Sequence, residues 1–200
     1  MSATPSTMLE LGTKAPDFSL PDVSSGKAIT LDTFAGSKAL LVMFICQHCP
    51  FVKHVKSELA RLGRDYSGKN AGIVGISSND PAVSFEDSPE GLKQMVADWG
   101  LNFPVCYDET QEAAKSYAAA CTPDLFLFDE NRRLVYRGQL DDSRPRNNKP
   151  VTGADIRAAL EAVLAGREVS SRQMPSIGCN IKWRPGNAPT YYYGAAKRVL

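Results

Sequence analysis

Two cysteines separated by two residues, Cys46 and Cys49, are the residues of this sequence best suited to chemistry. In the first turn of a helix such a pair can close a disulfide with little backbone movement, and the positive end of the helix dipole favours a thiolate. We therefore predict that Cys46 has a thiol pKa below the free value of about 8.5 and attacks. Cys49, one turn further in, would resolve the mixed disulfide. A protonated His48 would stabilise the Cys46 thiolate and make the pair more oxidising. The expected catalytic residues are thus Cys46, Cys49 and His48, and the expected activity is that of a thiol-disulfide oxidoreductase.

Two other interpretations of this segment remain open. Cys46, His48 and Cys49 are potential ligands for zinc or copper, which would make the chain a metal-binding or metal-delivery module. No second Cys-x-x-Cys pair or His-rich half-site completes a closed structural site, so we assign no metal ligands. The plainest alternative is a pair of buried thiols that take no part in chemistry. No tightly bound organic cofactor is implied.

Composition and charge exclude several classes of function. The chain has 200 residues, 43% of them hydrophobic, which suits a single globular domain. Its 23 basic and 22 acidic residues give no electrostatic footprint for nucleic acid or for a membrane surface. The longest apolar run, 39–46, is too short to span a bilayer, and residues 1–7 do not resemble a secretory signal. We expect a cytoplasmic protein, in which five cysteines favour catalysis or metal binding over structural disulfides.

The elements that must position the dithiol are a buried strand and an amphipathic helix. The continuous apolar run 39–45 predicts a strand buried on both faces, which delivers Cys46. Val52, Val55, Leu59 and Leu62 form one helical stripe, and Pro50 suits a first helical turn, so a helix is predicted from Pro50 to about Tyr66. Further strands are predicted at 71–77, 104–107, 125–128 and 134–137, and further helices at 91–99, 109–120 and from Thr152 or Asp155 to 164.

This order of elements predicts an α/β domain with a central mixed sheet sandwiched by helices. The domain is expected to cover residues 9–172 and to open with a hairpin extension. Residues 1–8 are expected to be flexible. Residues 173–200, rich in Gly, Pro, Asn and aromatic side chains, are expected to form an irregular tail that packs on the domain.

Four segments carry a resemblance to a known family: 12–20, 44–54, 121–129 and 178–183. The opening Gly-Thr-Lys-Ala-Pro-Asp-Phe-Ser-Leu is similar to the alkyl hydroperoxide reductase and thiol-specific antioxidant (redoxin) superfamily as a whole. The Cys-Gln-His-Cys-Pro segment and the late Gly-Cys-Asn-Ile-Lys-Trp segment together resemble one peroxiredoxin-like subgroup. The resemblance implies a thioredoxin-like fold and an antioxidant oxidoreductase. Its implied partners are protein or low-molecular-weight thiols and disulfides, with peroxide as a further candidate.

The resemblance also implies roles for residues outside the dithiol. Thr122-Pro123 matches the cis-proline of the superfamily, which faces the dithiol and leaves the preceding backbone free to pair with a bound substrate chain. Arg144, with Asp142, is expected to border the active site, where an arginine can orient a carboxylate or a thiolate. Thr122, Pro123 and Arg144 are therefore the expected substrate-binding residues.

Departures from the family pattern set the order of the two enzymatic hypotheses. Peroxiredoxins have Pro and then Thr or Ser before the peroxidatic cysteine to hold and polarise peroxide, and here, with Cys46 as that cysteine, the matching positions are Ala39 and Met43. The sequence also has Phe44 and Ile45 in place of the Trp that precedes the dithiol of typical thioredoxins. Dithiol oxidoreduction is therefore the first hypothesis, and a thiol peroxidase is the alternative.

Cys121 and Cys179 are candidates for additional redox residues. Cys121 lies two residues before the expected cis-proline, and so near the dithiol. Cys179 would pair with it, either as a structural bond or as a relay that carries oxidation away from Cys46; the alternative is two unrelated buried thiols. Late aromatic residues, Trp183 and Tyr191 to Tyr193, are expected to pack the tail on the domain, with a homodimer contact as the alternative.

Overall fold

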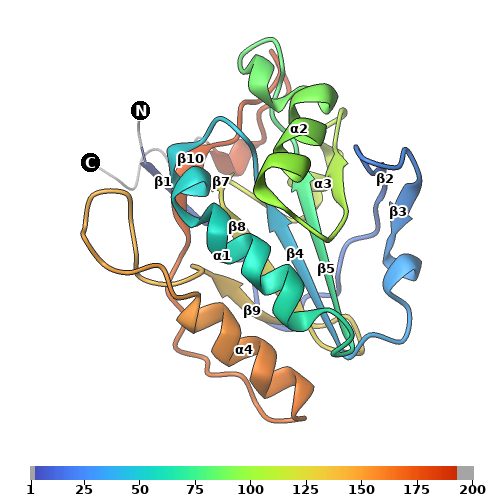
Figure 1. Ribbon diagram of the computed structural model, residues 1–200, viewed down its shortest axis with the longest axis vertical. Helices are drawn as coiled ribbons and strands as arrows, with labels where there is room; N and C mark the ends of the chain where they lie inside the picture. The colour runs from blue at the N-terminus through green and yellow to red at the C-terminus, as the bar shows by residue number, and fades with distance from the viewer. Residues whose placement is uncertain (1–2, 193–200) are drawn as a thin grey trace.

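A computed structural model describes residues 3–192 of the chain, and its main feature is a twisted five-stranded sheet (Figure 1). The strand order is β6-β5-β4-β8-β9. Strands β6, β5 and β4 are parallel, whereas β8 is antiparallel to β4 and β9 is antiparallel to β8. Their bounds are β4 Ala39–Phe44, β5 Ala71–Ser77, β6 Val105–Tyr107, β8 Asp124–Phe128 and β9 Leu134–Gly138. The mixed sheet expected from the sequence is confirmed.

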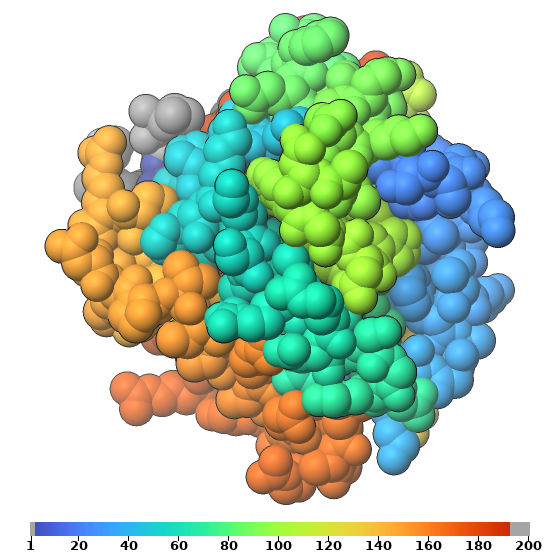
Figure 2. Space-filling view, viewed as in Figure 1, coloured from blue at the N-terminus to red at the C-terminus, as the bar shows by residue number. Residues whose placement is uncertain are grey.

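Both faces of this sheet are covered, which explains why β4 is apolar throughout. Leu41, Met43 and Ile45 point to one face and pack with helices α1, α2 and α4. Leu40, Val42 and Phe44 point to the other face, where helix α3 and the β2–β3 hairpin lie. In Figure 2, α1 runs across the first of these faces with α2 and α4 beside it. The bounds are α1 Pro50–Tyr66, α2 Pro89–Trp99, α3 Glu112–Ser116, α4 Ala154–Leu164, β2 Ser19–Pro21 and β3 Ala28–Thr30.

Helix α1 begins directly after the dithiol. Pro50 occupies the first helical turn, where its missing N–H is not needed. Val52, Val55, Leu59 and Leu62 are buried along one stripe, as the spacing predicted. The helix is therefore anchored against the sheet over its whole length, and its amino end is held beside the carboxyl end of β4.

The two chain ends differ from the sequence-based expectation. Residues Ala3–Pro5 form strand β1 and Ile177–Asn180 form strand β10, which pair antiparallel with each other. Strand β10 also pairs with β7, Cys121–Thr122, in the three-stranded order β1-β10-β7. The expected flexible start and irregular tail therefore each contribute a strand to a small sheet that β7 completes. In Figure 1 this sheet lies beside the amino end of α1.

The part of the tail that the structure describes lies against the domain. Trp183 packs on the core of the α3 face, and the Tyr191 hydroxyl donates to the carbonyl oxygens of Ala114 and Ala119 at 3.3 and 3.1 Å. Tyr193 and the rest of the predicted tail, 193–200, lie outside the described residues. Among residues 3–192, no helix has the length and apolar character needed to cross a bilayer.

Helix α3 is shorter than the predicted helix over 109–120. Gln111 has a φ of 63° before the helix, and Ala118 has a φ of 50° after it. Both values lie in the left-handed region, which cannot continue a right-handed helix. The Asp108 carboxylate accepts a hydrogen bond from the Ala114 N–H at 3.0 Å and so fixes the late start. The segment is rich in alanine, which favours helix, so its sequence did not reveal either interruption.

Candidate active site

The two cysteines of the dithiol lie in the turn that joins β4 to α1. Both side chains are 0% exposed, and both belong to the core cluster under α1. The predicted helix start at Pro50 is confirmed, and the N-cap residue is Cys49 and not Cys46. Cys49 is therefore the thiol nearest the unpaired N–H groups and the positive end of the helix dipole.

Thr122 contacts both thiols. Its hydroxyl oxygen lies 3.2 Å from Cys46 Sγ, and its carbonyl oxygen accepts from the Cys49 thiol at 3.2 Å. The peptide bond between Thr122 and Pro123 is cis. The structure therefore brings Thr122 and the predicted cis-proline to the dithiol, although they follow it by more than seventy residues.

A buried carboxylate, Asp87, holds the other side of the dithiol turn. Its Oδ1 accepts from the backbone N–H groups of Gln47 and His48 at 2.7 and 3.1 Å. Its Oδ2 accepts from His48 Nδ1 at 2.5 Å and from Asn79 Nδ2 at 2.8 Å. The Asp87 side chain is fully buried, and these hydrogen bonds together with the neighbouring imidazole outweigh the effect of burial and lower its pKa. Asp87 thus fixes both the backbone of the turn and the orientation of the His48 ring.

The acidities of the two thiols are opposite to the sequence-based expectation. Burial, with contributions from the Cys49 thiol and the negative charge of Asp87, raises the pKa of Cys46 well above its ordinary value. The pKa of Cys49 is lowered, because interactions with the thiols of Cys179 and Cys46 outweigh its burial. The Thr122 side chain also lowers the pKa of Cys49. The low pKa predicted for Cys46 is thus not found, and Cys49 is the thiol whose pKa is lowered.

Cys179 is the third thiol of this cluster. In the β10–β7 pair it lies directly opposite Thr122, and opposite residues of an antiparallel pair place their side chains on one face. That face carries the Thr122 side chain, and hence the dithiol. Cys179 is 2% exposed, and its interaction with Cys49 together with burial raises its pKa.

Cys121 does not share this position. It precedes Thr122 on β7, so its side chain points to the other face of the small sheet, where its thiol donates to the Pro123 carbonyl oxygen at 3.6 Å. The structure therefore does not bring Cys121 and Cys179 together as the expected pair. Cys179 interacts with Cys49 instead.

The predicted substrate groove is already filled by the chain itself. The backbone before the cis-proline was expected to be free, but β10 pairs with it. Gly178 makes this close approach possible, because a Cβ atom at that position would lie 1.9 Å from the Thr122 carbonyl oxygen. Arg144 is held within its own loop, donating to the carbonyl oxygens of Asp141 and Ser143 at 2.8 and 2.6 Å. It lines a small depression with Pro123, and no hydrogen bond joins it to a thiol among the described residues.

A grouping of possible metal ligands is present, and hydrogen bonds engage part of it. Cys46 Sγ, a His48 ring nitrogen and an Asp87 oxygen all lie within 4.8 Å of one another. The four hydrogen bonds to Asp87 account for the position of its carboxylate and of the His48 ring. These bonds order the turn, while His48 Nε2 is buried without a hydrogen-bond partner among the described residues, so the metal-binding alternative stays open.

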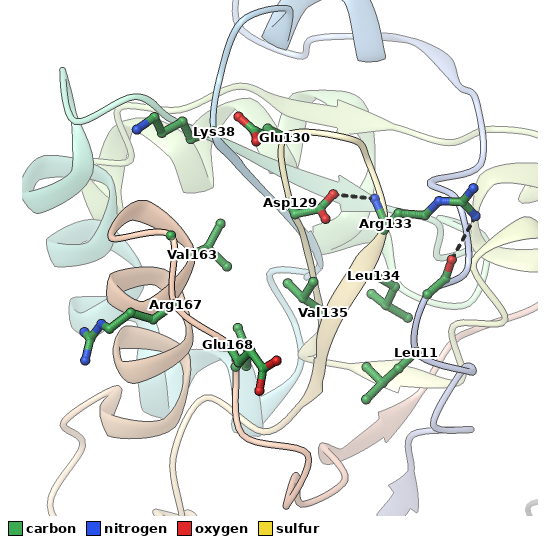
Figure 3. Close-up of a pocket in the computed structure, with 13 residues that line it drawn as sticks. Leu11, Lys38, Asp129, Glu130, Arg133, Leu134, Val135, Val163, Arg167 and Glu168 are labelled. Atoms are coloured by element: carbon green, nitrogen blue, oxygen red, sulfur yellow. Dashed lines mark hydrogen bonds between the residues drawn. The ribbon is translucent and has the colours of Figure 1, made fainter.

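A separate cavity of about 520 Å³ lies at the other end of the sheet (Figure 3). Lys38, which precedes β4, lines it together with Glu168 and with Arg133, whose guanidinium donates to the Gly12 carbonyl oxygen at 3.1 Å. None of the predicted catalytic or substrate-binding residues lines this cavity. The thiol cluster is therefore a buried site and not the floor of this pocket.

Sequence reasoning missed Asp87 and Asn79. Both follow β5, the parallel neighbour of β4, and the carboxyl ends of neighbouring parallel strands meet at one edge of a sheet. A polar segment after β5 should therefore face the residues that follow β4, which include the dithiol. This rule about neighbouring parallel strands could have predicted that Asp87 and Asn79 lie near the dithiol.

Comparisons with known proteins identify relatives of this chain. A sequence model of the AhpC/TSA family matches residues 11–137. The thiol-disulfide oxidoreductase ResA of Bacillus thuringiensis is 26% identical over 127 residues, which cover 64% of this chain and 68% of that protein. A protein named as peroxiredoxin bcp, from Helicobacter pylori, is 29% identical over 111 residues, covering 56% of this chain and 67% of that protein.

Solved structures extend the likeness to the whole described fold. An uncharacterised conserved protein from Geobacillus kaustophilus is 54% identical and superposes with a TM-score of 0.91, covering 93% of this chain and 98% of that one. More distant structures, which include thioredoxin-type oxidoreductases and a peroxidoxin, are 17–23% identical with TM-scores of 0.56–0.63. These distant structures show the fold alone, and it is thioredoxin-like.

Proposed function

Because the chain belongs to the AhpC/TSA family, we propose that it is a thiol-disulfide oxidoreductase in which Cys49 attacks and Cys46 resolves. The observation that carries this proposal is the position of Cys49 at the N-cap of α1, beside thiol donors that lower its pKa. A thiolate is the form of cysteine that attacks disulfides, so the thiol with the lower pKa is the better nucleophile near neutral pH.

The exchange would proceed in two balanced steps. The Cys49 thiolate attacks one sulfur of a substrate disulfide, forms a mixed disulfide and releases the first substrate sulfur as a thiolate. Cys46 then loses its proton and attacks the Cys49 sulfur, which closes the Cys46–Cys49 disulfide and releases the second substrate thiol. The substrate is reduced by two electrons, and the two cysteines are oxidised by two. The reverse sequence would oxidise a substrate dithiol.

Thr122 and Asp87 would support these steps from opposite sides. The Thr122 hydroxyl lies 3.2 Å from Cys46 Sγ, where it can stabilise the thiolate that Cys46 must form in order to attack. The negative charge of Asp87 opposes that same thiolate, and so keeps Cys46 protonated until the mixed disulfide exists. His48 would orient the turn through its bond to Asp87, and is in this proposal a positioning residue.

Protein or small-molecule disulfides are the proposed substrates. The family and the name of the ResA relative both support thiol substrates for this chain. Both thiols of the pair are 0% exposed, so a substrate disulfide reaches Cys49 only after the covering segments open locally. The proposal therefore includes a local opening step before attack.

A thiol peroxidase is the second candidate, favoured by the family and by the peroxiredoxin relative. With Cys49 as the attacking thiol, the position three residues earlier is Cys46, where the family pattern has Thr or Ser. The hydroxyl that polarises peroxide is thus replaced by a thiol. This substitution favours disulfide exchange over peroxide reduction.

Reaction of the reduced protein with glutathione disulfide tests the proposal. Wild type is expected to release two glutathione thiols per chain and to end with an intramolecular disulfide, while Cys49→Ala releases none. Peroxide consumption measured in parallel should be slow. Equal reactivity of wild type and Cys49→Ala would contradict the assignment of the attacking thiol, and rapid peroxide consumption with little disulfide exchange would establish the peroxidase instead.

A further inference from the structure

Strand β10 places a third thiol, Cys179, beside the dithiol. Cys179 lies opposite Thr122 in the β10–β7 register, and Thr122 is the residue whose carbonyl oxygen and hydroxyl contact Cys49 and Cys46. Cys46, Cys49 and Cys179 are buried together in one core cluster. Because Cys49 also interacts with both of the other thiols, the three side chains lie together, although Cys179 comes from the tail.

Hydrogen bonds before and after β10 fix Cys179 at this position. Before β10, the Ser176 carbonyl oxygen accepts from the Ser6 N–H at 2.9 Å, and the Ser176 hydroxyl donates to the Gly138 carbonyl oxygen at 2.5 Å. After β10, the Lys182 N–H donates to Asn79 Oδ1 at 2.8 Å. Asn79 is also the residue that donates to Asp87, so the same amide ties the tail to the dithiol turn.

Strand β10 also occupies the position expected for a substrate chain. It lies antiparallel against the backbone that precedes the cis-proline, and Gly178 permits an approach that any side chain would block. A cysteine presented on such a strand stands where the cysteine of a bound polypeptide substrate would stand. The fold therefore offers Cys49 an exchange partner within its own chain.

We propose that Cys179 is a second resolving thiol, which attacks a mixed disulfide on Cys49 and forms a Cys49–Cys179 disulfide. This inference rests on the proposed function, because the mixed disulfide is the product of attack by Cys49 on a substrate. In the step, the Cys179 thiol loses its proton, its sulfur bonds to the Cys49 sulfur, and the substrate sulfur leaves and takes up a proton. Cys46 is left as a free thiol, and a disulfide now covalently joins the tail to the dithiol turn.

The register excludes Cys121 from this role and supplies a matched control. Cys121 is the neighbour of Thr122 on β7, is equally buried, and points to the other face. If the second resolving thiol needed only to be buried nearby, Cys121 and Cys179 would serve equally well. If the β10–β7 register decides which thiol can reach Cys49, only Cys179 forms the disulfide.

Trypsin separates the relevant cysteines, which makes the test direct. Cleavage after Lys and Arg places Cys46 and Cys49 in peptide 39–53, Cys121 in 116–132 and Cys179 in 173–182. The Cys46→Ser protein is reduced, treated with glutathione disulfide, blocked with a maleimide and digested. We expect a disulfide between peptides 39–53 and 173–182 and the release of two glutathione thiols per chain. Cys46→Ser/Cys121→Ala should give the same product, whereas Cys46→Ser/Cys179→Ala should stop at a stable glutathione adduct on peptide 39–53.

The outcomes separate this inference from the proposed function. A glutathione adduct that persists on peptide 39–53 in Cys46→Ser would overturn the role of Cys179 and leave attack by Cys49 intact. A link between 39–53 and 116–132 would overturn it in favour of Cys121. Absence of any adduct or link in all three variants would overturn both proposals. Wild type treated with a limiting amount of glutathione disulfide provides a measurement without substitutions, and there a fraction linked through 173–182 is expected beside the Cys46–Cys49 disulfide.

Discussion

Replacement of Asp124 by Asn is expected to stabilise the protein at neutral and alkaline pH. Asp124 begins β8 directly after the cis-proline, and its side chain is fully buried. Its Oδ2 accepts from the Ala120 N–H at 3.4 Å, while its Oδ1 has no hydrogen-bond partner among the described residues. Burial raises the pKa of Asp124 from 3.8 to about 7. The carboxylate is thus held where its charge is poorly solvated.

The sign and size of the effect follow from this shift. A carboxyl group whose pKa is raised in the folded state binds its proton more tightly there, so the folded state loses stability as pH rises from 3.8 to about 7. Each pKa unit corresponds to about 1.36 kcal/mol, so the full loss is about 4 kcal/mol. Asn has nearly the same shape, keeps the acceptor for Ala120 and carries no charge. Asp124→Asn should therefore be up to about 4 kcal/mol more stable than wild type at pH 8, with the difference vanishing near pH 3.5.

Urea unfolding of both proteins across this pH range provides the assay. The difference in unfolding free energy should rise by about 1.4 kcal/mol per pH unit between pH 4 and 7 and then level off. A difference that does not change with pH, or a variant that is less stable than wild type at pH 8, would refute the assignment of Asp124 as a poorly solvated buried acid.

Three further perturbations test other parts of the structure. Asp87→Asn should lower the free energy of unfolding by about 3 kcal/mol at pH 7, because the Oδ2 bonds to His48 and Asn79 are lost. Since the pKa of Asp87 is lowered in the folded state, this loss of stability should be full above pH 3.8 and should shrink as the pH falls further. Urea unfolding measures it. Gly178→Ala should destabilise the protein by about 1–3 kcal/mol, because the new Cβ would collide with the Thr122 carbonyl oxygen. Amide hydrogen exchange should become faster, and only in β10 and β1. Unchanged exchange in these strands would contradict the close approach. Prolonged treatment with a chelator should leave the glutathione exchange rate and the melting temperature unchanged, and loss of either would revive the metal-binding alternative.

The sequence predicts the framework of the site because the signals there are local. The apolar run of β4, the stripe of α1 and the placement of Pro50 each lie within one element. The small sheet of the tail has no comparable signal, because β10 is four residues long and contains a glycine. It is a strand because β1 and β7 pair with its two edges, and neither partner is near it in sequence.

The order of thiol acidity could not be predicted from the Cys-x-x-Cys spacing. That order depends on Cys179, which reaches Cys49 only through the β10–β7 register, and on Asp87, which lies after a different strand. The helix start predicted at Pro50 makes Cys49 the N-cap residue, whereas the acidity argument placed Cys46 at the helix N-terminus. The homodimer contact and the cytoplasmic location stay predictions.

Ultraviolet absorbance of the thiolate, followed against pH, tests the central claim most directly. Wild type should show one thiolate that persists well below the free thiol pKa of about 8.5. Cys49→Ala should lose this signal, and Cys46→Ala should keep it at a somewhat higher pKa, because one of the two thiol donors to Cys49 is gone. Loss of the signal in Cys46→Ala and its survival in Cys49→Ala would contradict the account and return the attacking role to Cys46.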